Sequence, residues 1–154
     1  MDRKKIHNIL VVCTGNSCRS IMAEGYLRKR VKEEAMELEI RSAGTGAFNG
    51  TRPPKETIEI LHDEGIPSEG LEAKIITKEM VEWADAILAM ESLHKEIIVQ
   101  TWPEAEKKTY LLGKYNSSEF NDIPDPIGRS VDFYRETFSL IKESVEEFIK
   151  WLKG

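Results

Sequence analysis

Short apolar runs alternate along the chain with amphipathic stretches, and this alternation is the feature that most limits the folds open to it. Four runs have the composition of strands: Ile9–Val12, Leu38–Ser42, Ala86–Met90 and Lys108–Leu112. Five stretches have the composition of helices: Ser20–Glu34, Pro54–Glu64, Thr77–Trp83, Glu91–Thr101 and Val131–Leu152. Strands that alternate with helices favour a parallel sheet with helices on its faces. We therefore predict an α/β fold of three layers, in which a four-stranded parallel sheet is flanked by helices.

The C-terminal part of the chain carries the clearest helical pattern, preceded by the longest expected loop. Apolar side chains recur every three or four residues through the helix: Val131, Tyr134, Phe138, Ile141, Val145, Phe148 and Leu152. Such a stripe predicts a helix packed on the sheet, with a coiled-coil partner as the alternative. The preceding segment, residues 113–129, is rich in Gly, Asn, Ser, Asp and Pro, which predicts a loop long enough to serve a function.

Composition argues against several classes of protein. The 154 residues carry a net charge of −5 at pH 7 without a long basic run, so nucleic acid is not expected as the main ligand. No apolar stretch is long enough to cross a bilayer, and the N-terminal residues do not resemble a signal peptide. Two cysteines cannot build a disulfide framework, so we expect them to serve chemistry in the cytoplasm. We expect one domain over residues 1–154, a monomer by default, that binds no membrane.

Residues 13–20 join the first predicted strand to the first predicted helix, at the edge of an open α/β sheet where ligands bind. The free amides of a helix N-terminus favour an anion there. Gly15 and Asn16 tolerate the left-handed backbone that turns consecutive amides inward around phosphate oxygens. Arg19 adds a planar fork that can hold two of those oxygens. The loop is therefore predicted to bind phosphate through six residues besides Arg19: Thr14, Gly15, Asn16, Ser17, Cys18 and Ser20.

Cys13 stands at the start of this loop, where the groups that favour a phosphate also favour a thiolate. A thiolate that faces a bound phosphorus atom can take up the phosphoryl group as a cysteinyl-phosphate. The Ser20 hydroxyl can donate to the sulfur and stabilise it as the attacking and as the leaving group. The alternatives are a buried packing cysteine and half of a metal site formed with Cys18. The three histidines, at positions 7, 62 and 94, provide no partner pair nearby, so we predict no metal.

A candidate proton donor lies in the long loop, in the run Ile123–Pro126. Two prolines fix the backbone on either side of Asp125 and set its carboxylate in a stiff turn. Asp125 is predicted to protonate the leaving group and then to deprotonate the water that hydrolyses the cysteinyl-phosphate. A plain Asp-Pro turn is the alternative, and Asp122 is the competing carboxylate.

These motifs make the chain resemble the low-molecular-weight protein tyrosine phosphatases over essentially its whole length. The family signature C-x4-C-R-S stands at residues 13–20, its general-acid Asp-Pro pair at residues 125–126, and its Ser-Ala-Gly-Thr stretch at residues 42–45. The resemblance implies the four-stranded parallel fold, hydrolysis of a phosphorylated protein side chain, and neither metal nor cofactor. It also implies that Ser42 supports Asn16 by a hydrogen bond.

Cys18 matches the second cysteine of the family's loop. The resemblance implies that it forms a reversible disulfide with the nucleophile under oxidation, which protects the nucleophile from further oxidation. A cysteine that merely packs is the alternative.

The chain departs from the tyrosine phosphatases at positions that bear on its substrate. Many members have a histidine in the Asn/Ser network where this chain has Leu71, so we predict a network that is smaller or differently completed. Ile127-Gly128 stands where the tyrosine phosphatases have two tyrosines at the pocket mouth. The run Asp125–Ser130 resembles a bacterial branch that includes protein-arginine phosphatases.

Two further positions concern the pocket wall. The tyrosine-specific enzymes place a bulky aliphatic residue at the position of Ser17, and the arginine branch places Thr there. A small hydroxyl leaves room and polarity for a guanidinium group, although Ser17 lacks the methyl group of threonine. Phe48 matches a family aromatic that can stack on either substrate, and a core aromatic is the alternative. We expect phosphotyrosine as the substrate, with phosphoarginine as the alternative.

Three other functions share parts of this pattern. A thioredoxin-coupled arsenate reductase needs two cysteines beyond Cys13 and Cys18, which the chain does not have. A carrier that holds phosphate on cysteine without hydrolysing it does not need a general base such as Asp125. A non-catalytic phosphopeptide-binding module needs the cradle but not both Cys13 and Asp125.

Overall fold

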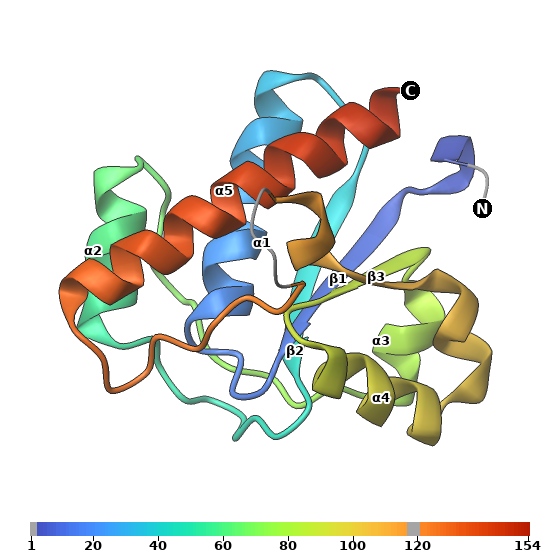
Figure 1. The fold of residues 1–154 in the computed structure, drawn as a ribbon, viewed down its shortest axis with the longest axis horizontal. Helices are drawn as coiled ribbons and strands as arrows, with labels where there is room; N and C mark the ends of the chain where they lie inside the picture. The colour runs from blue at the N-terminus through green and yellow to red at the C-terminus, as the bar shows by residue number, and fades with distance from the viewer. Residues whose placement is uncertain (1–2, 117–120) are drawn as a thin grey trace.

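Four strands form one sheet in the order β2-β1-β3-β4, and each neighbouring pair is parallel (Figure 1). The strands are β1 (Asn8–Cys13), β2 (Glu39–Gly44), β3 (Ala86–Ala89) and β4 (Thr109–Leu111). The computed structural model describes residues 3–116 and 121–154. Because parallel strands end at the same edge of the sheet, the residues that follow β1 and β3 are brought together there.

Helices cover both faces of the sheet (Figure 1). They are α1 (Arg19–Glu33), α2 (Lys55–Asp63), α3 (Lys78–Trp83), α4 (Ser92–Thr101) and α5 (Val131–Lys153), with the short 3-10 helices η1 (Arg3–Lys5), η2 (Pro103–Lys108) and η3 (Leu112–Tyr115). Helices α1, α2 and α5 lie on one face, and α3 and α4 lie on the other. The predicted three-layer α/β fold with four parallel strands is confirmed.

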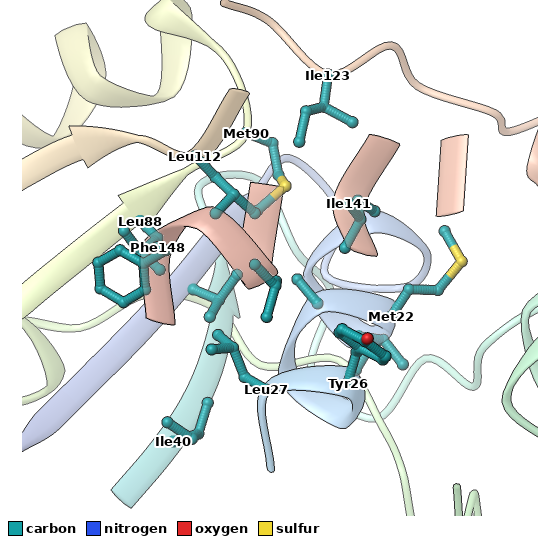
Figure 2. Close-up of a cluster of buried hydrophobic side chains, with 14 of the residues drawn as sticks. Met22, Tyr26, Leu27, Ile40, Leu88, Met90, Leu112, Ile123, Ile141 and Phe148 are labelled. Atoms are coloured by element: carbon teal, nitrogen blue, oxygen red, sulfur yellow. The ribbon is translucent and has the colours of Figure 1, made fainter. Parts of the chain in front are cut away.

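Strand β1 is buried on both faces, which explains why its sequence is a continuous apolar run and not an alternating one. Ile9 and Val11 belong to the larger core under α1 and α5, and Leu10 and Val12 belong to the smaller core under α3 and α4. Figure 2 shows the larger core, where side chains of α5 such as Phe148 meet those of the sheet. Close packing on both sides gives the loop after β1 a fixed starting point.

The predicted helix features are present with small differences. The Thr77 hydroxyl accepts the Met80 amide proton at 3.3 Å and caps α3, so the helix predicted from Thr77 begins one residue later, at Lys78. The apolar stripe of α5 is buried at Tyr134, Phe138, Ile141, Val145 and Phe148, half-buried at Leu152 and exposed at Val131. Among residues 3–116 and 121–154, no helix combines the length and the apolar composition needed to cross a bilayer.

The predicted loop over residues 113–129 is wrong at its start, because η3 occupies Leu112–Tyr115. Gly113 allows this turn to pack closely, since a Cβ atom there would lie only 2.0 Å from the Asn121 carbonyl oxygen. Part of the predicted loop, residues 117–120, lies outside the described residues.

Replacing Phe148 with Ala should lower the free energy of unfolding by about 3–5 kcal/mol, because the substitution empties a fully buried aromatic site. The ring also stacks on Trp151 and meets Tyr115 edge-on, with centroids 5.8 and 5.6 Å away. Urea unfolding measures the change. Glu147→Ala, at an exposed neighbour on the same helix, is the control and should change the free energy by less than about 0.5 kcal/mol. Equal losses in the two variants would contradict this description of the core.

Candidate active site

The loop of residues 14–18 connects the end of β1 to the start of α1 and is supported by the end of β2. The Gly46 amide donates to the Thr14 carbonyl oxygen at 2.9 Å. A Cβ atom on Gly44 would lie 2.4 Å from that same oxygen, so only glycine permits this close approach. Gly15, which was expected to share the left-handed backbone, does not have a positive φ. The backbone after Cys13 is therefore held from one side by the end of β2 and the residues that follow it.

Asn16 turns the loop back on itself. Its φ of 51° is left-handed, and its side chain is buried. The side-chain amide donates to the hydroxyl oxygens of Ser20 at 2.7 Å and Ser42 at 3.0 Å, and its oxygen accepts the Lys74 amide proton at 2.9 Å. The Asn16 backbone amide donates to the sulfur of Cys13 at 3.3 Å. These bonds offset the cost of a left-handed non-glycine residue.

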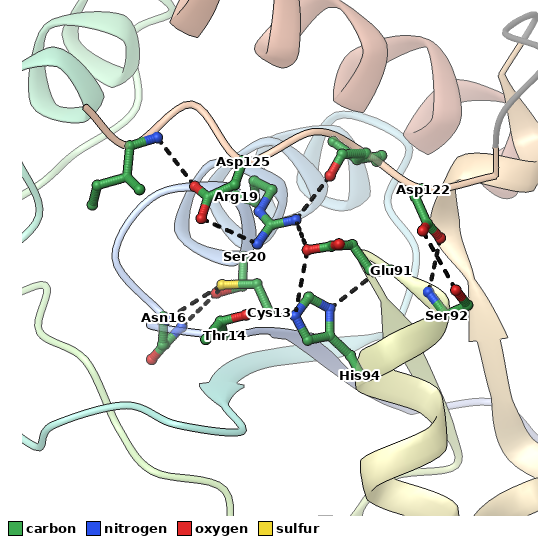
Figure 3. Close-up of polar contacts among 12 residues, drawn as sticks. Cys13, Thr14, Asn16, Arg19, Ser20, Glu91, Ser92, His94, Asp122 and Asp125 are labelled. Atoms are coloured by element: carbon green, nitrogen blue, oxygen red, sulfur yellow. Dashed lines mark hydrogen bonds and ion pairs between the residues drawn. The ribbon is translucent and has the colours of Figure 1, made fainter. Parts of the chain in front are cut away.

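A buried carboxylate fixes the direction of this hydrogen-bond network. The Ser42 hydroxyl donates to Glu24, because an ionised carboxylate can only accept. The Ser42 oxygen therefore accepts from Asn16, which also donates to Ser20. The Ser20 hydroxyl proton is then free to be donated to the Cys13 sulfur, 3.0 Å away (Figure 3). The network therefore ends in a hydroxyl that can donate to the Cys13 sulfur.

Glu24 was not found by the sequence analysis, although it completes the network that has no histidine. Leu71, at the position where the family resemblance implied a histidine in many members, packs against the larger core. Glu24 lies in α1 with 7% of its surface exposed, and its second oxygen is 2.7 Å from the guanidinium of Arg28. In the sequence this pair, four residues apart, looks like an ordinary surface ion pair of a helix. The network is therefore completed differently, by a carboxylate of α1.

Arg19 is almost wholly buried, so its charge requires partners. Its Nη1 atom donates to Glu91 at 2.6 Å and to the Ile123 carbonyl oxygen at 2.8 Å. Its Nη2 atom lies 3.6 Å from a carboxylate oxygen of Asp125 (Figure 3). The other Asp125 oxygen accepts the Ile127 amide proton at 3.1 Å, which closes the turn at Pro126.

These residues surround a pocket of about 200 Å³. The pocket is lined by Cys13, Thr14, Gly15, Ser17, Cys18, Arg19, Asp125 and Ile127. A larger cavity of about 560 Å³ lies between α1 and the segment 65–71, but no cysteine lines it. Sulfur, guanidinium and carboxylate thus meet in the smaller pocket. An α/β sheet with these groups at the carboxyl end of β1 can bind an anion beside a thiol.

The other candidate residues lie outside the pocket lining. Asn16, Ser20 and Ser42 stand behind the loop and support it. Phe48 is 82% exposed, so it is not a core residue, and it does not line the pocket. Asp122, the competing carboxylate, instead accepts the amide proton of Ser92 at 2.8 Å at the start of α4.

The start of α4 supplies two residues that the sequence analysis did not place in the site. Glu91 holds Arg19, and the Glu91 amide donates to the Nδ1 atom of His94 at 3.0 Å. The Nε2 atom of His94 lies 2.8 Å from the Thr14 hydroxyl oxygen. Burial and the nearby charge of Arg19 lower the pKa of His94 to about 4, so the imidazole is neutral at pH 7. The sequence feature that could have identified Glu91 and His94 is their position just after the predicted strand Ala86–Met90.

Cys18 is a buried free thiol, as is Cys13. Its sulfur lies 3.6 Å from the Tyr134 hydroxyl oxygen, and burial raises the pKa of the Cys18 thiol. Cys18 is therefore protonated at neutral pH, which makes it a poor nucleophile.

Comparison with known proteins identifies the family. Residues 8–154 match the model of the low molecular weight phosphotyrosine protein phosphatase family. The chain is 33% identical to a protein-arginine-phosphatase of Bacillus subtilis, over 95% of this chain and 97% of that protein. It is 34% identical to the low molecular weight protein-tyrosine-phosphatase Etp of Escherichia coli, over 99% of each. Among solved structures, a YwlE arginine phosphatase mutant with a phosphorylated active-site serine has a TM-score of 0.88 at 32% identity, over 95% of each chain.

The chain belongs to the low molecular weight phosphotyrosine protein phosphatase family, and it is an enzyme of the protein phosphatase class. The resemblance inferred from the motifs is therefore confirmed. The relatives include both tyrosine and arginine phosphatases at nearly equal identity, so identity alone does not separate the two substrates.

The neutral buried imidazole of His94 should make the fold less stable in mild acid. In the unfolded chain the His94 imidazole takes up a proton near pH 6.5, whereas in the folded protein it stays neutral down to about pH 4. Stability should therefore fall as the pH is lowered through this interval, by roughly 2–3 kcal/mol at about pH 4.5. Urea unfolding near pH 7 and about pH 4.5 should show a smaller decrease for His94→Gln than for the wild type. The exposed His62, replaced in the same way, is the control, and an equal decrease in all three proteins would refute the assignment.

Proposed function

We propose that the protein hydrolyses phosphorylated side chains of proteins through a cysteinyl-phosphate on Cys13. The observation that carries this proposal is the pocket of about 200 Å³ that Cys13, Arg19 and Asp125 line together. These groups can serve as the nucleophile, the cation and the proton donor of a phosphoryl transfer to cysteine.

In the first step, the Cys13 thiolate attacks phosphorus in line with the leaving group. The S–P bond forms while the bond from phosphorus to the side-chain oxygen or nitrogen breaks, and Asp125 gives its proton to the departing atom. Arg19 and the amides of the loop hold the negatively charged phosphoryl oxygens. Glu91 and the Ile123 carbonyl occupy Nη1 of Arg19, which leaves Nη2 directed toward the pocket.

In the second step, water attacks the cysteinyl-phosphate. Asp125, now a carboxylate, takes a proton from the water as the P–O bond forms and the S–P bond breaks, and inorganic phosphate is released. The leaving thiolate is stabilised by the Ser20 hydroxyl at 3.0 Å and the Asn16 amide at 3.3 Å. The related arginine phosphatase mutant, in which a phosphorylated serine stands in the active site, supports a covalent intermediate at this position.

The proposed substrate is phosphotyrosine, with phosphoarginine as a second candidate. Ile127 is 55% exposed and lines the pocket, where its side chain can pack against a phenyl ring. Ser17 favours the second candidate, because it adds a hydroxyl to the pocket lining where an aliphatic wall would exclude a guanidinium group. Phe48, exposed outside the pocket lining, is proposed to contact the substrate protein.

We also propose that Cys18 forms a disulfide with Cys13 under oxidising conditions. Both thiols are free and line the same pocket, and the raised pKa of Cys18 keeps it as an unreacted thiol in the absence of oxidant. A peroxide oxidises the Cys13 thiolate to a sulfenic acid; the Cys18 sulfur, as it loses its proton, then attacks the Cys13 sulfur, so that the S–S bond forms as the S–O bond breaks and water leaves. Because turnover needs Cys13 as a free thiolate, the proposed location is the reducing cytoplasm. The enzyme is proposed to work as a monomer.

Asp125→Asn should lower kcat about 100-fold with phenyl phosphate and far less with p-nitrophenyl phosphate, because only the poorer leaving group needs its proton. Steady-state assays with both esters measure the difference. Binding of inorganic phosphate should persist in this variant, since Arg19 and the loop are unchanged.

Cys13→Ser gives the background for these assays and should abolish turnover of both esters. Asp132→Asn, at an exposed aspartate, should behave as the wild type. If Cys13→Ser retains wild-type turnover, the proposed function is wrong; if Asp125→Asn slows both esters equally or not at all, Asp125 is not the acid.

Ser17→Ile should shift the ratio of kcat/KM toward phosphotyrosine over phosphoarginine peptides by roughly tenfold, the size expected for one pocket contact. The added side chain removes the hydroxyl and the space that a guanidinium group needs. Parallel assays of phosphate release from the two peptides give the ratio. Ser139→Ile, at an exposed position of α5, is the matched control. An unchanged ratio would remove the reason to consider phosphoarginine on the basis of Ser17.

A further inference from the structure

Helix α4 reaches the phosphate loop through His94, a side chain that the two chemical steps do not use. Its Nε2 atom lies 2.8 Å from the hydroxyl oxygen of Thr14, which lines the pocket (Figure 3). His94 is completely buried, whereas Thr14 is exposed. A buried imidazole thus stands directly behind a hydroxyl that faces the ligand space.

The hydrogen bonds determine where each proton lies. A neutral imidazole carries one N–H group, and Nδ1 of His94 is already the acceptor for the Glu91 amide. The proton must therefore be on Nε2, which donates it to the Thr14 oxygen. Within residues 3–116 and 121–154, His94 is the one hydrogen-bond partner of this hydroxyl, so Thr14 keeps its own proton for a ligand.

We propose that His94 orients the Thr14 hydroxyl as a hydrogen-bond donor to the phosphoryl group in the pocket. Thr14 then supplies a side-chain donor in addition to the loop amides, and His94 is a positioning residue that acts through it. The inference rests on the proposed function, because its ligand is the phosphoryl group of that reaction. The Thr14 backbone is already held by Gly46, so fixing the hydroxyl completes the orientation of this residue.

Two substitutions of His94 separate this role from simple capping of α4. Asn can accept the Glu91 amide proton in place of Nδ1 but is too short to donate to Thr14. Gln can bring an amide N–H to the place of Nε2. If His94 serves only to cap α4, His94→Asn should weaken phosphate binding less than His94→Gln does. If His94 orients the Thr14 hydroxyl, His94→Gln should weaken phosphate binding less than His94→Asn does.

The test measures the Kd of inorganic phosphate near pH 7 by isothermal titration calorimetry, so that binding is measured independently of turnover. Thr14→Val, which keeps the shape of the side chain, should weaken binding about tenfold, the loss expected for a hydrogen bond to a charged oxygen. Thr14→Ser should weaken it less than about threefold, because the hydroxyl remains. His94→Asn should weaken binding more than His94→Gln does, and the double variant Thr14→Val/His94→Asn should bind no more weakly than Thr14→Val alone.

Matched controls remove the same groups elsewhere. Thr101→Val, near the far end of α4, and His62→Asn, on the exposed surface of α2, should bind phosphate as the wild type does. Wild-type affinity in Thr14→Val would overturn the inference, as would equal effects of His94→Asn in the presence and absence of the Thr14 hydroxyl. If the His94 variants do not fold, wild-type affinity in Thr14→Val still overturns the inference, because the Thr14 hydroxyl is the group through which His94 is proposed to act. A wild type that binds phosphate but hydrolyses no phosphate ester would refute the proposed function, whereas these affinities would still decide the role of Thr14.

Discussion

The left-handed turn at Asn16 is the constraint on which the rest of the site depends. This conformation is costly for any residue with a side chain, and here it is stabilised by bonds from three separate segments: Ser20 of α1, Ser42 of β2 and the backbone of Lys74. The same turn directs the Asn16 amide at the Cys13 sulfur. Because Asn16 joins the loop to β2 and to the segment that contains Lys74, the protein itself fixes the shape of the loop. Binding then has no need to order the loop.

The second constraint is the buried charge of Arg19. A guanidinium group that is 2% exposed is costly unless its donors are satisfied, and Glu91 and the Ile123 carbonyl satisfy Nη1. Asp125 lies farther from Nη2, at 3.6 Å, and its side chain is 44% exposed. An incoming phosphoryl group can therefore take up Nη2 without breaking the buried pair with Glu91. The ion pair with Glu91 and the longer contact with Asp125 are therefore on different nitrogen atoms of the arginine.

The sequence allowed the fold and the loop to be predicted because both are local patterns. Runs of strand and helix composition predicted the parallel sheet, and Cys13 to Ser20 are contiguous, so their shared loop required no tertiary information. Glu24 and His94 were missed for a physical reason. Each lies in a helix whose sequence does not show what its buried side faces, and α4 reaches the loop only because β3 pairs with β1. Phe48 was expected to form part of the pocket wall because it matches a family aromatic, but the structure places its ring in solvent.

The connection from β3 to α4 explains how Asp125, more than a hundred residues after Cys13, comes to lie beside Arg19. The Met90 amide donates to the carbonyl oxygen of Val12, and the Met90 carbonyl accepts the amide proton of Ile123. The next two residues make similar contacts: the Glu91 carboxylate accepts from Arg19, and the Ser92 amide donates to Asp122. Met90 and Ser92 therefore bind the segment that carries Asp125, and Glu91 binds Arg19 at the start of α1. The residues at the end of a buried strand thus set the distance from Arg19 to Asp125, and the prolines on either side of Asp125 help to keep it fixed.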